Sequence, residues 1–158
     1  GAVQHHFKTR DELIAAAYEH TAELFRETLE ATVTGIGSPT ERFRAACHLL
    51  AGCADDSERT RAATAAWMAF AGIAATGGPA APGYREAWQQ VEDNLAAAVG
   101  DAEEAALLLA TLDGIAVARL TEPDRMTAER GRALVDKQLA RLAVADDYAG
   151  GSARGHGA

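Results

Sequence analysis

The residue types best suited to chemistry are few in this sequence: it has five histidines and two cysteines. His20 and Glu23 lie three residues apart, but no Glu-x-x-His or His-Glu-x-x-His motif accompanies them, and these are the spacings with which helices hold metal ions. Gly-rich phosphate loops and nucleophile elbows are also absent from the sequence. The sequence therefore predicts no metal, no cofactor and no enzymatic activity, with a helical-bundle enzyme kept as an alternative.

The two cysteines, Cys47 and Cys53, are six residues apart. In a helix this spacing puts them on different faces, so a disulfide between them is not expected. Free cysteines are among the most buried residue types, and we expect both thiols to be reduced and packed in the core. A redox-sensing role is the alternative.

Composition indicates one soluble all-α domain. The chain has 158 residues, a length at which one core can form without disulfides or metal. It has only 4 prolines, and Val, Ile and Thr do not form alternating runs of the kind that predict strands. No apolar run approaches the ~20 residues of a membrane span, and no signal peptide opens the chain. We therefore expect a cytoplasmic protein that does not bind membranes.

Net charge limits how this chain could contact nucleic acid. Its formal charge is −8, whereas DNA is bound mainly through basic surfaces. The body of the chain is therefore not expected to clamp DNA by itself.

Helix-start signals recur along the sequence. Thr9 and Glu12 form a capping box, and Ser38-Pro39 and Asp101 begin two further apolar patterns of helical spacing. Gly-rich and Pro-containing breaks separate these patterns. The sequence predicts about six helices, over residues 10–34, 39–53, 58–75, 84–99, 102–121 and 127–145.

One predicted helix has an alternative interpretation. Asp113-Gly114 could form a tight hairpin turn, with residues 115–120 as a strand, but no partner strand precedes it. We keep the helix. Gly114 costs such a helix about 1 kcal/mol relative to Ala, which is acceptable if another helix approaches closely there.

The first thirteen residues carry a more specific pattern, from Gly1 to Leu13. A helix end with His6-Phe7 leads through a short turn to a Thr-Arg-x-Glu-Leu helix start. This block resembles the signature of the tetracycline-repressor (TetR) family, in which a recognition helix ends in Gly-x-x-Tyr-x-His-Phe and the connecting helix begins with Ser/Thr-Lys-x-Glu-Leu. Gln4 departs from the aromatic and Lys8 from the proline usual there. A cloning remnant could supply Gly-Ala and a His pair, but would not run in register into a capping box.

Two later stretches agree with the same family. Trp67-Met68-Ala69-Phe70 is similar to the Trp-Leu-x-Phe stretch of BetI-type members, and Leu112-Asp113-Gly114 followed by Arg119 resembles their Asp-Gly-Leu helix. The resemblance implies a remnant of the helix-turn-helix DNA-binding domain in residues 1–8, whose first helices would be missing. A ligand-binding and dimerisation domain over residues 9–145 and a disordered tail over residues 146–158 would follow.

By that resemblance the chain would be a bacterial, ligand-responsive transcriptional repressor. It would bind operator DNA as a homodimer and be released by a small apolar or amphipathic effector. The start of the connecting helix offers free N–H groups to DNA phosphates. The expected DNA-binding residues are Val3, Gln4, His5, His6, Lys8, Thr9 and Arg10.

The resemblance also implies two further sets of site residues. The last two helices would pair with their copies in a four-helix dimer interface, through Leu108, Leu112, Ile115, Arg119, Val135, Leu139 and Leu142. The effector would enter between the central helices. Because ligand sites are mostly apolar with a few polar groups, the expected ligand-binding residues are Phe25, Phe43, Cys47, His48, Trp67, Phe70, Tyr84 and Trp88.

Two alternatives stay open. The same aromatic residues could simply fill the core. The chain could also be a small-molecule-binding bundle with no DNA role, which its acidic charge permits and its opening block opposes.

Overall fold

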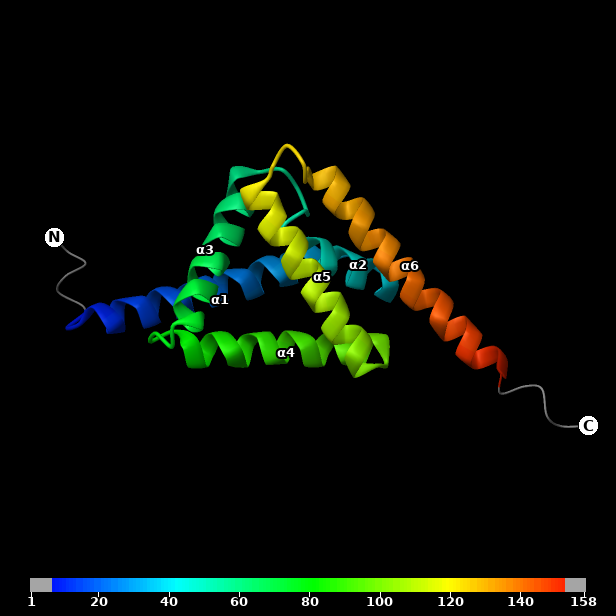
Figure 1. Ribbon diagram of the computed structural model, residues 1–158, viewed down its shortest axis with the longest axis horizontal. Helices are drawn as coiled ribbons and strands as arrows, with labels where there is room; N and C mark the ends of the chain where they lie inside the picture. Colours follow the sequence, from blue (N-terminus) through cyan, green and yellow to red (C-terminus); the bar gives the residue numbers. More distant parts are fainter. Residues whose placement is uncertain (1–6, 153–158) are drawn as a thin grey trace, which may run out of the picture.

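The computed structural model describes residues 7–152, and the side chains of residues 7–142. The described residues form six helices and no strand, which confirms the predicted all-α class. Figure 1 shows the six helices: α1 (Arg10–Val33), α2 (Pro39–Leu50), α3 (Glu58–Ala75), α4 (Ala81–Val99), α5 (Ala102–Thr121) and α6 (Ala128–Ser152).

Side-chain caps fix where most of these helices begin. The Thr9 hydroxyl accepts a hydrogen bond from the Glu12 N–H at 3.1 Å, so α1 starts where the sequence predicts. The Glu12 carboxylate binds the N–H of Lys8, at 2.7 Å, and not that of the cap residue itself. Equivalent caps begin α2, α3 and α5, from Ser38, Ser57 and Asp101.

Several boundaries differ from the predicted ones. α2 ends at Leu50 because Gly52 takes a left-handed conformation, with φ of 61°. α4 begins at Ala81, since Pro82 is tolerated in a first helical turn. α6 extends to Ser152, beyond the predicted end near residue 145. Residues 1–6 and 153–158 lie outside the described residues.

α5 runs unbroken through Asp113 and Gly114, so the hairpin alternative is wrong. A Cβ atom built at Gly114 would meet no atom within 4 Å, apart from its own helix and chain neighbours. The close helix approach expected at this glycine therefore does not come from within the described chain.

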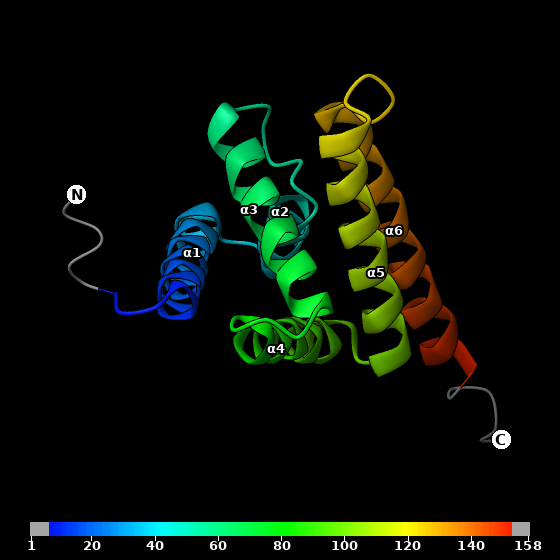
Figure 2. The ribbon, with the colours of Figure 1, turned by 60° about the vertical axis from the view of Figure 1, so that its left-hand side comes forward.

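The buried side chains form two separate clusters. The α5 cluster joins α2, α4, α5 and α6; it consists of Cys47, Ala51, Cys53, Leu95, Ala105, Leu108, Leu109, Leu112, Ile115, Ala118, Met126, Ala128 and Val135. The α1 cluster consists of Tyr18, Phe70 and Ala80, with Ile14, Ala22, Trp67, Ile73 and Tyr84 packed against it. In Figure 2, α1 lies at one side of the molecule and α5 and α6 at the other.

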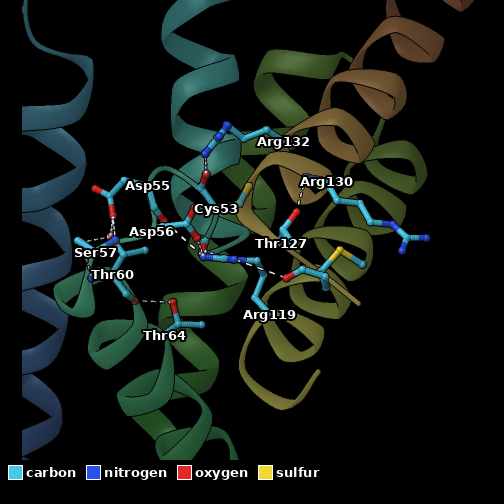
Figure 3. Close-up of polar contacts among 12 residues, drawn as sticks. Cys53, Asp55, Asp56, Ser57, Thr60, Thr64, Arg119, Thr127, Arg130 and Arg132 are labelled. Atoms are coloured by element: carbon cyan, nitrogen blue, oxygen red, sulfur yellow. Dashed lines mark hydrogen bonds and ion pairs between the residues drawn. The ribbon is translucent and has the colours of Figure 1, made fainter. Parts of the chain in front are cut away.

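A buried guanidinium ties the α2–α3 loop to α5. Arg119 is 5% exposed; its Nε donates to the carbonyl of Gly52 at 3.0 Å and its Nη2 to Asp56 Oδ1 at 3.0 Å. It also reaches the carbonyls of Asp55, at 3.4 Å, and Met126, at 3.5 Å. Figure 3 shows Arg119 beside Asp55 and Asp56 of this loop. Arg119 is therefore engaged inside its own chain.

Replacing Arg119 by Met should destabilise the fold strongly. The loop carbonyls would lose their donors while remaining away from water, and such buried losses cost about 3 kcal/mol together. Arg125→Met is the matched control, because Arg125 is half-exposed and pairs with Glu122 in its own turn. Urea unfolding of the two variants should differ accordingly, and equal free energies of unfolding would contradict this role for Arg119.

Candidate functional site

A cavity of about 1050 Å³ is lined in part by side chains that pack against each of the two buried clusters. Its walls come from five helices, α1 to α5, and from the α2–α3 loop. The volume is slightly above the range typical of small-molecule sites, about 300–1,000 Å³. Most of the wall is apolar, built from Leu24, Phe25, Leu49, Leu50, Trp67, Met68, Tyr84, Trp88, Val117 and several alanines.

Four aromatic rings form one continuous wall of this cavity. Phe25 meets Trp67 edge-on with ring centroids 5.6 Å apart, and Trp67 lies 5.0 Å from Trp88. Trp88 in turn stacks on Tyr84 at 5.2 Å. Trp67 packs against the α1 cluster and Trp88 against the α5 cluster, so the two clusters meet at this aromatic wall.

Polar side chains are fewer than apolar ones in the cavity wall, and its threonines come from α1 and α3. Thr21, Thr28 and Thr32 of α1 line the cavity, as do Thr60 and Thr64 of α3. The hydroxyls of Thr21, Thr32 and Thr64 donate to carbonyls four residues earlier in their own helices. They are therefore partly satisfied before any ligand arrives.

One carboxyl group of the cavity wall, that of Asp113 of α5, is half-buried. Its Oδ2 accepts a hydrogen bond from the indole Nε1 of Trp88 at 3.1 Å. Burial raises the pKa of the Asp113 carboxyl, and the hydrogen bond from Trp88 lowers it by a smaller amount. A carboxyl group with such a shift in a cavity is a candidate ligand contact.

The eight predicted ligand-binding residues divide into two groups of four. Phe25, Trp67, Tyr84 and Trp88 lie on the cavity wall. The other four do not line it: Phe43 packs against the α5 cluster, Cys47 is fully buried within it, Phe70 lies in the α1 cluster, and His48 faces α6. Helical spacing could not separate these groups, since Trp67 and Phe70 are three residues apart on one face of α3.

His48 belongs to a polar tie between α2 and α6. Its Nε2 lies 2.8 Å from Asp136 Oδ1, and Arg44 donates to both oxygens of the same carboxylate. The hydrogen bond from Arg44 is the largest cause that lowers the pKa of Asp136. This network fastens α6 to the body of the chain and lies away from the cavity lining.

The predicted dimer residues lie mainly inside the chain itself. Leu108, Leu112 and Val135 are 0% exposed, Ile115 and Arg119 are 5% exposed, and Leu139 and Leu142 are partly buried against the α5 cluster. The side chains that face outward are their neighbours. Leu107 of α5 is 56% exposed and Leu134 of α6 is 37% exposed.

The predicted DNA-binding residues fall at the start of α1. Lys8, Thr9 and Arg10 are exposed, with Arg10 as the first residue of the helix. The remaining four, Val3, Gln4, His5 and His6, lie outside the described residues.

Sequence reasoning missed Asp113 and the threonines as cavity residues. The sequence places Asp113 in a possible Asp-Gly turn and in the Asp-Gly family match, although an acid within a largely apolar helix was the available signal for a cavity residue. Among the side chains of residues 7–142, no group of three from His, Cys, Asp or Glu is arranged to hold a metal ion. None of the six described helices is both long and apolar enough to cross a membrane.

Comparison with known proteins finds a matching family model and a similar solved structure. Residues 39–144 match the family model of the BetI-type transcriptional repressor, C-terminal domain. The structure is similar to the crystal structure of a transcriptional regulator from Rhodococcus sp. Rha1, with a TM-score of 0.77 and 30% sequence identity. That similarity covers 90% of this chain and 77% of the other. Among curated proteins, no match to the chain is found.

The two thiols should be unreactive in the folded protein. Burial raises the pKa of the Cys47 thiol to about 12 and that of Cys53 to about 11, and both side chains are 0% exposed. Iodoacetamide at pH 8 should therefore label neither cysteine in native protein and both in urea, as measured by intact mass. A His20→Cys variant, exposed on α1, provides the positive control. Native labelling of Cys47 or Cys53 at the rate of that control would contradict the assignment.

Proposed function

This chain belongs to the TetR family of transcriptional regulators, and from that premise we propose that it is a DNA-binding repressor released by a small molecule that occupies the cavity. The observation that carries the proposal is the position of the cavity. Its wall includes Trp67 and Tyr84, which pack against the α1 cluster, and Leu50 and Trp88, which pack against the α5 cluster. An occupant would contact both clusters at once.

DNA contact is proposed at the start of α1. Lys8 and Arg10 are exposed there, beside a helix N-terminus that favours phosphate groups. We include Val3, Gln4, His5, His6 and Thr9 in the same contact. With a net charge of −8, the rest of the chain would be repelled by DNA, which restricts binding to this end.

Dimerisation is proposed through the outer faces of α5 and α6. Leu107, Ala110 and Gly114 share one face of α5 and are exposed, and Gly114 leaves room for the backbone of a second helix. Leu134 adds an exposed apolar side chain on α6. The predicted residues Leu108, Leu112, Ile115, Arg119, Val135, Leu139 and Leu142 would support these helices from the inner side.

In the proposed mechanism the dimer holds two DNA-binding heads, one at the start of each α1. The two heads lie about one DNA turn, ~34–36 Å, apart. An effector in the cavity favours a state in which α1 lies differently relative to α5 and α6, and the heads no longer match the operator. A coupling free energy of about 1–3 kcal/mol would change DNA affinity by roughly 5–150-fold.

The dimer proposal predicts the effect of a charge on the outer face. Leu107→Glu should convert dimers to monomers at micromolar concentration, because the introduced carboxylates would be buried against apolar surface without partners. Leu13→Glu is the matched control: Leu13 is a similarly exposed leucine, 40% exposed, on α1. Light scattering measures the mass of each variant. A dimer that persists with Leu107→Glu would contradict this interface.

DNA binding by the complete gene product tests the function itself. Fluorescence polarisation with operator-containing DNA should show affinity that falls steeply with salt, because bound phosphates release counterions. Lys8→Gln should weaken binding and reduce the salt slope by about one ion. Absence of DNA affinity at low salt would contradict the repressor proposal and favour a ligand-binding bundle without a DNA role.

A further inference from the structure

The charged side chains of the cavity wall differ in their exposure to solvent. Glu27, Asp55 and Arg59 line it and are exposed to solvent, whereas Asp113 is half-buried. The carboxylate of Asp55 is already occupied, since its Oδ1 accepts from the Ser57 N–H at 2.8 Å and the Thr60 hydroxyl at 2.7 Å. Asp113 is thus the carboxyl group best placed to meet a molecule inside the cavity.

The Asp113 carboxyl group accepts one hydrogen bond from the described part of the chain. Trp88 donates to Oδ2, and no other hydrogen bond to this carboxyl is found among the described residues. A carboxylate accepts several hydrogen bonds in water, and Oδ1, which has no donor among those residues and is not fully buried, is left open to a donor from the cavity. Burial raises the pKa of this group. A cation placed beside Oδ1 would restore the compensation that water supplied.

The surroundings of Asp113 suit a cation with an apolar body. Trp88, which donates to Asp113, stacks on Tyr84 at 5.2 Å and lies 5.0 Å from Trp67. Aromatic rings attract a cation held over their faces and bury large apolar area. The same wall offers no basic side chain beside Asp113, since Arg59, the basic residue of the lining, is exposed on α3.

We propose that the effector carries a protonated amine, whose N–H donates to Asp113 Oδ1 while the apolar part of the molecule packs against Trp67, Tyr84 and Trp88. This inference rests on the proposed function, because it names the chemical class of the effector. It predicts that carboxylic acids and other anions bind most weakly, since an anion would be repelled by the Asp113 carboxylate.

Three probes that each carry a phenyl ring on a four-carbon chain test the proposal: 4-phenylbutylamine, 4-phenylbutanol and 4-phenylbutyrate. Trp67 and Trp88 are the two tryptophans of the chain and both line the cavity, so intrinsic fluorescence reports its occupation directly. At pH 7 the amine should bind at least ~10-fold more tightly than the alcohol, as expected for a charge-assisted hydrogen bond, and the butyrate most weakly.

Asp113→Asn separates charge from packing. The amide oxygen keeps an acceptor for Trp88, while the negative charge is removed, so the preference for the amine over the alcohol should disappear. Glu27→Gln is the matched control, because it removes an exposed carboxylate from the same cavity wall and should leave the preference within about twofold. Thermal unfolding of both variants checks that the fold is retained.

Five outcomes would overturn the proposal. These are equal binding of amine and alcohol, equal binding of amine and butyrate, tighter binding of butyrate, no binding of any probe, and an unchanged preference in Asp113→Asn. None of these readouts involves DNA. If the amine binds as expected but the complete gene product has no DNA affinity, the repressor function is wrong and the amine site stands.

Discussion

The burial of the Arg119 charge is the constraint on which the rest of this fold depends. A guanidinium that is 5% exposed must have its hydrogen bonds satisfied, and Arg119 finds its acceptors in the α2–α3 loop and at Met126. Arg132 of α6 adds a bond to the Cys53 carbonyl at 2.9 Å. The loop that lines one end of the cavity is therefore fixed to α5 and α6 as a single unit.

α1 is held in a different way. It packs on α2 and α3, and its buried Tyr18 packs edge-on against Phe70 and donates from its hydroxyl to the Gly83 carbonyl at 2.8 Å. The α1 cluster contains three buried residues, against thirteen in the α5 cluster, so less apolar burial holds it in place. In the proposed mechanism this difference lets an occupant of the cavity shift α1 while α5 and α6 keep their packing.

Local signals predicted the helices and much less of the site. Thr9, Ser57 and Asp101 begin helices through hydrogen bonds to residues three positions away, and such bonds can be inferred from sequence spacing. Arg119 and Asp113 acquire their roles from residues 67 and 25 positions away, at Gly52 and Trp88, and spacing carries no information on those contacts. For the same reason the sequence named eight ligand-binding residues and could not say which four would reach the cavity wall.

The chain comprises a firmly tied α5–α6 unit and a more weakly held α1, and both line the cavity. Native-state hydrogen exchange measures this most directly, because it gives the free energy of opening for each segment. The amides of α5 and those of Gly52 and Cys53 should exchange together and most slowly, and the amides of α1 should open at a clearly lower free energy. Exchange of α1 as slow as that of α5 would contradict the weaker attachment of α1. Independent opening of Gly52 and Cys53 would contradict the tie between the α2–α3 loop and α5.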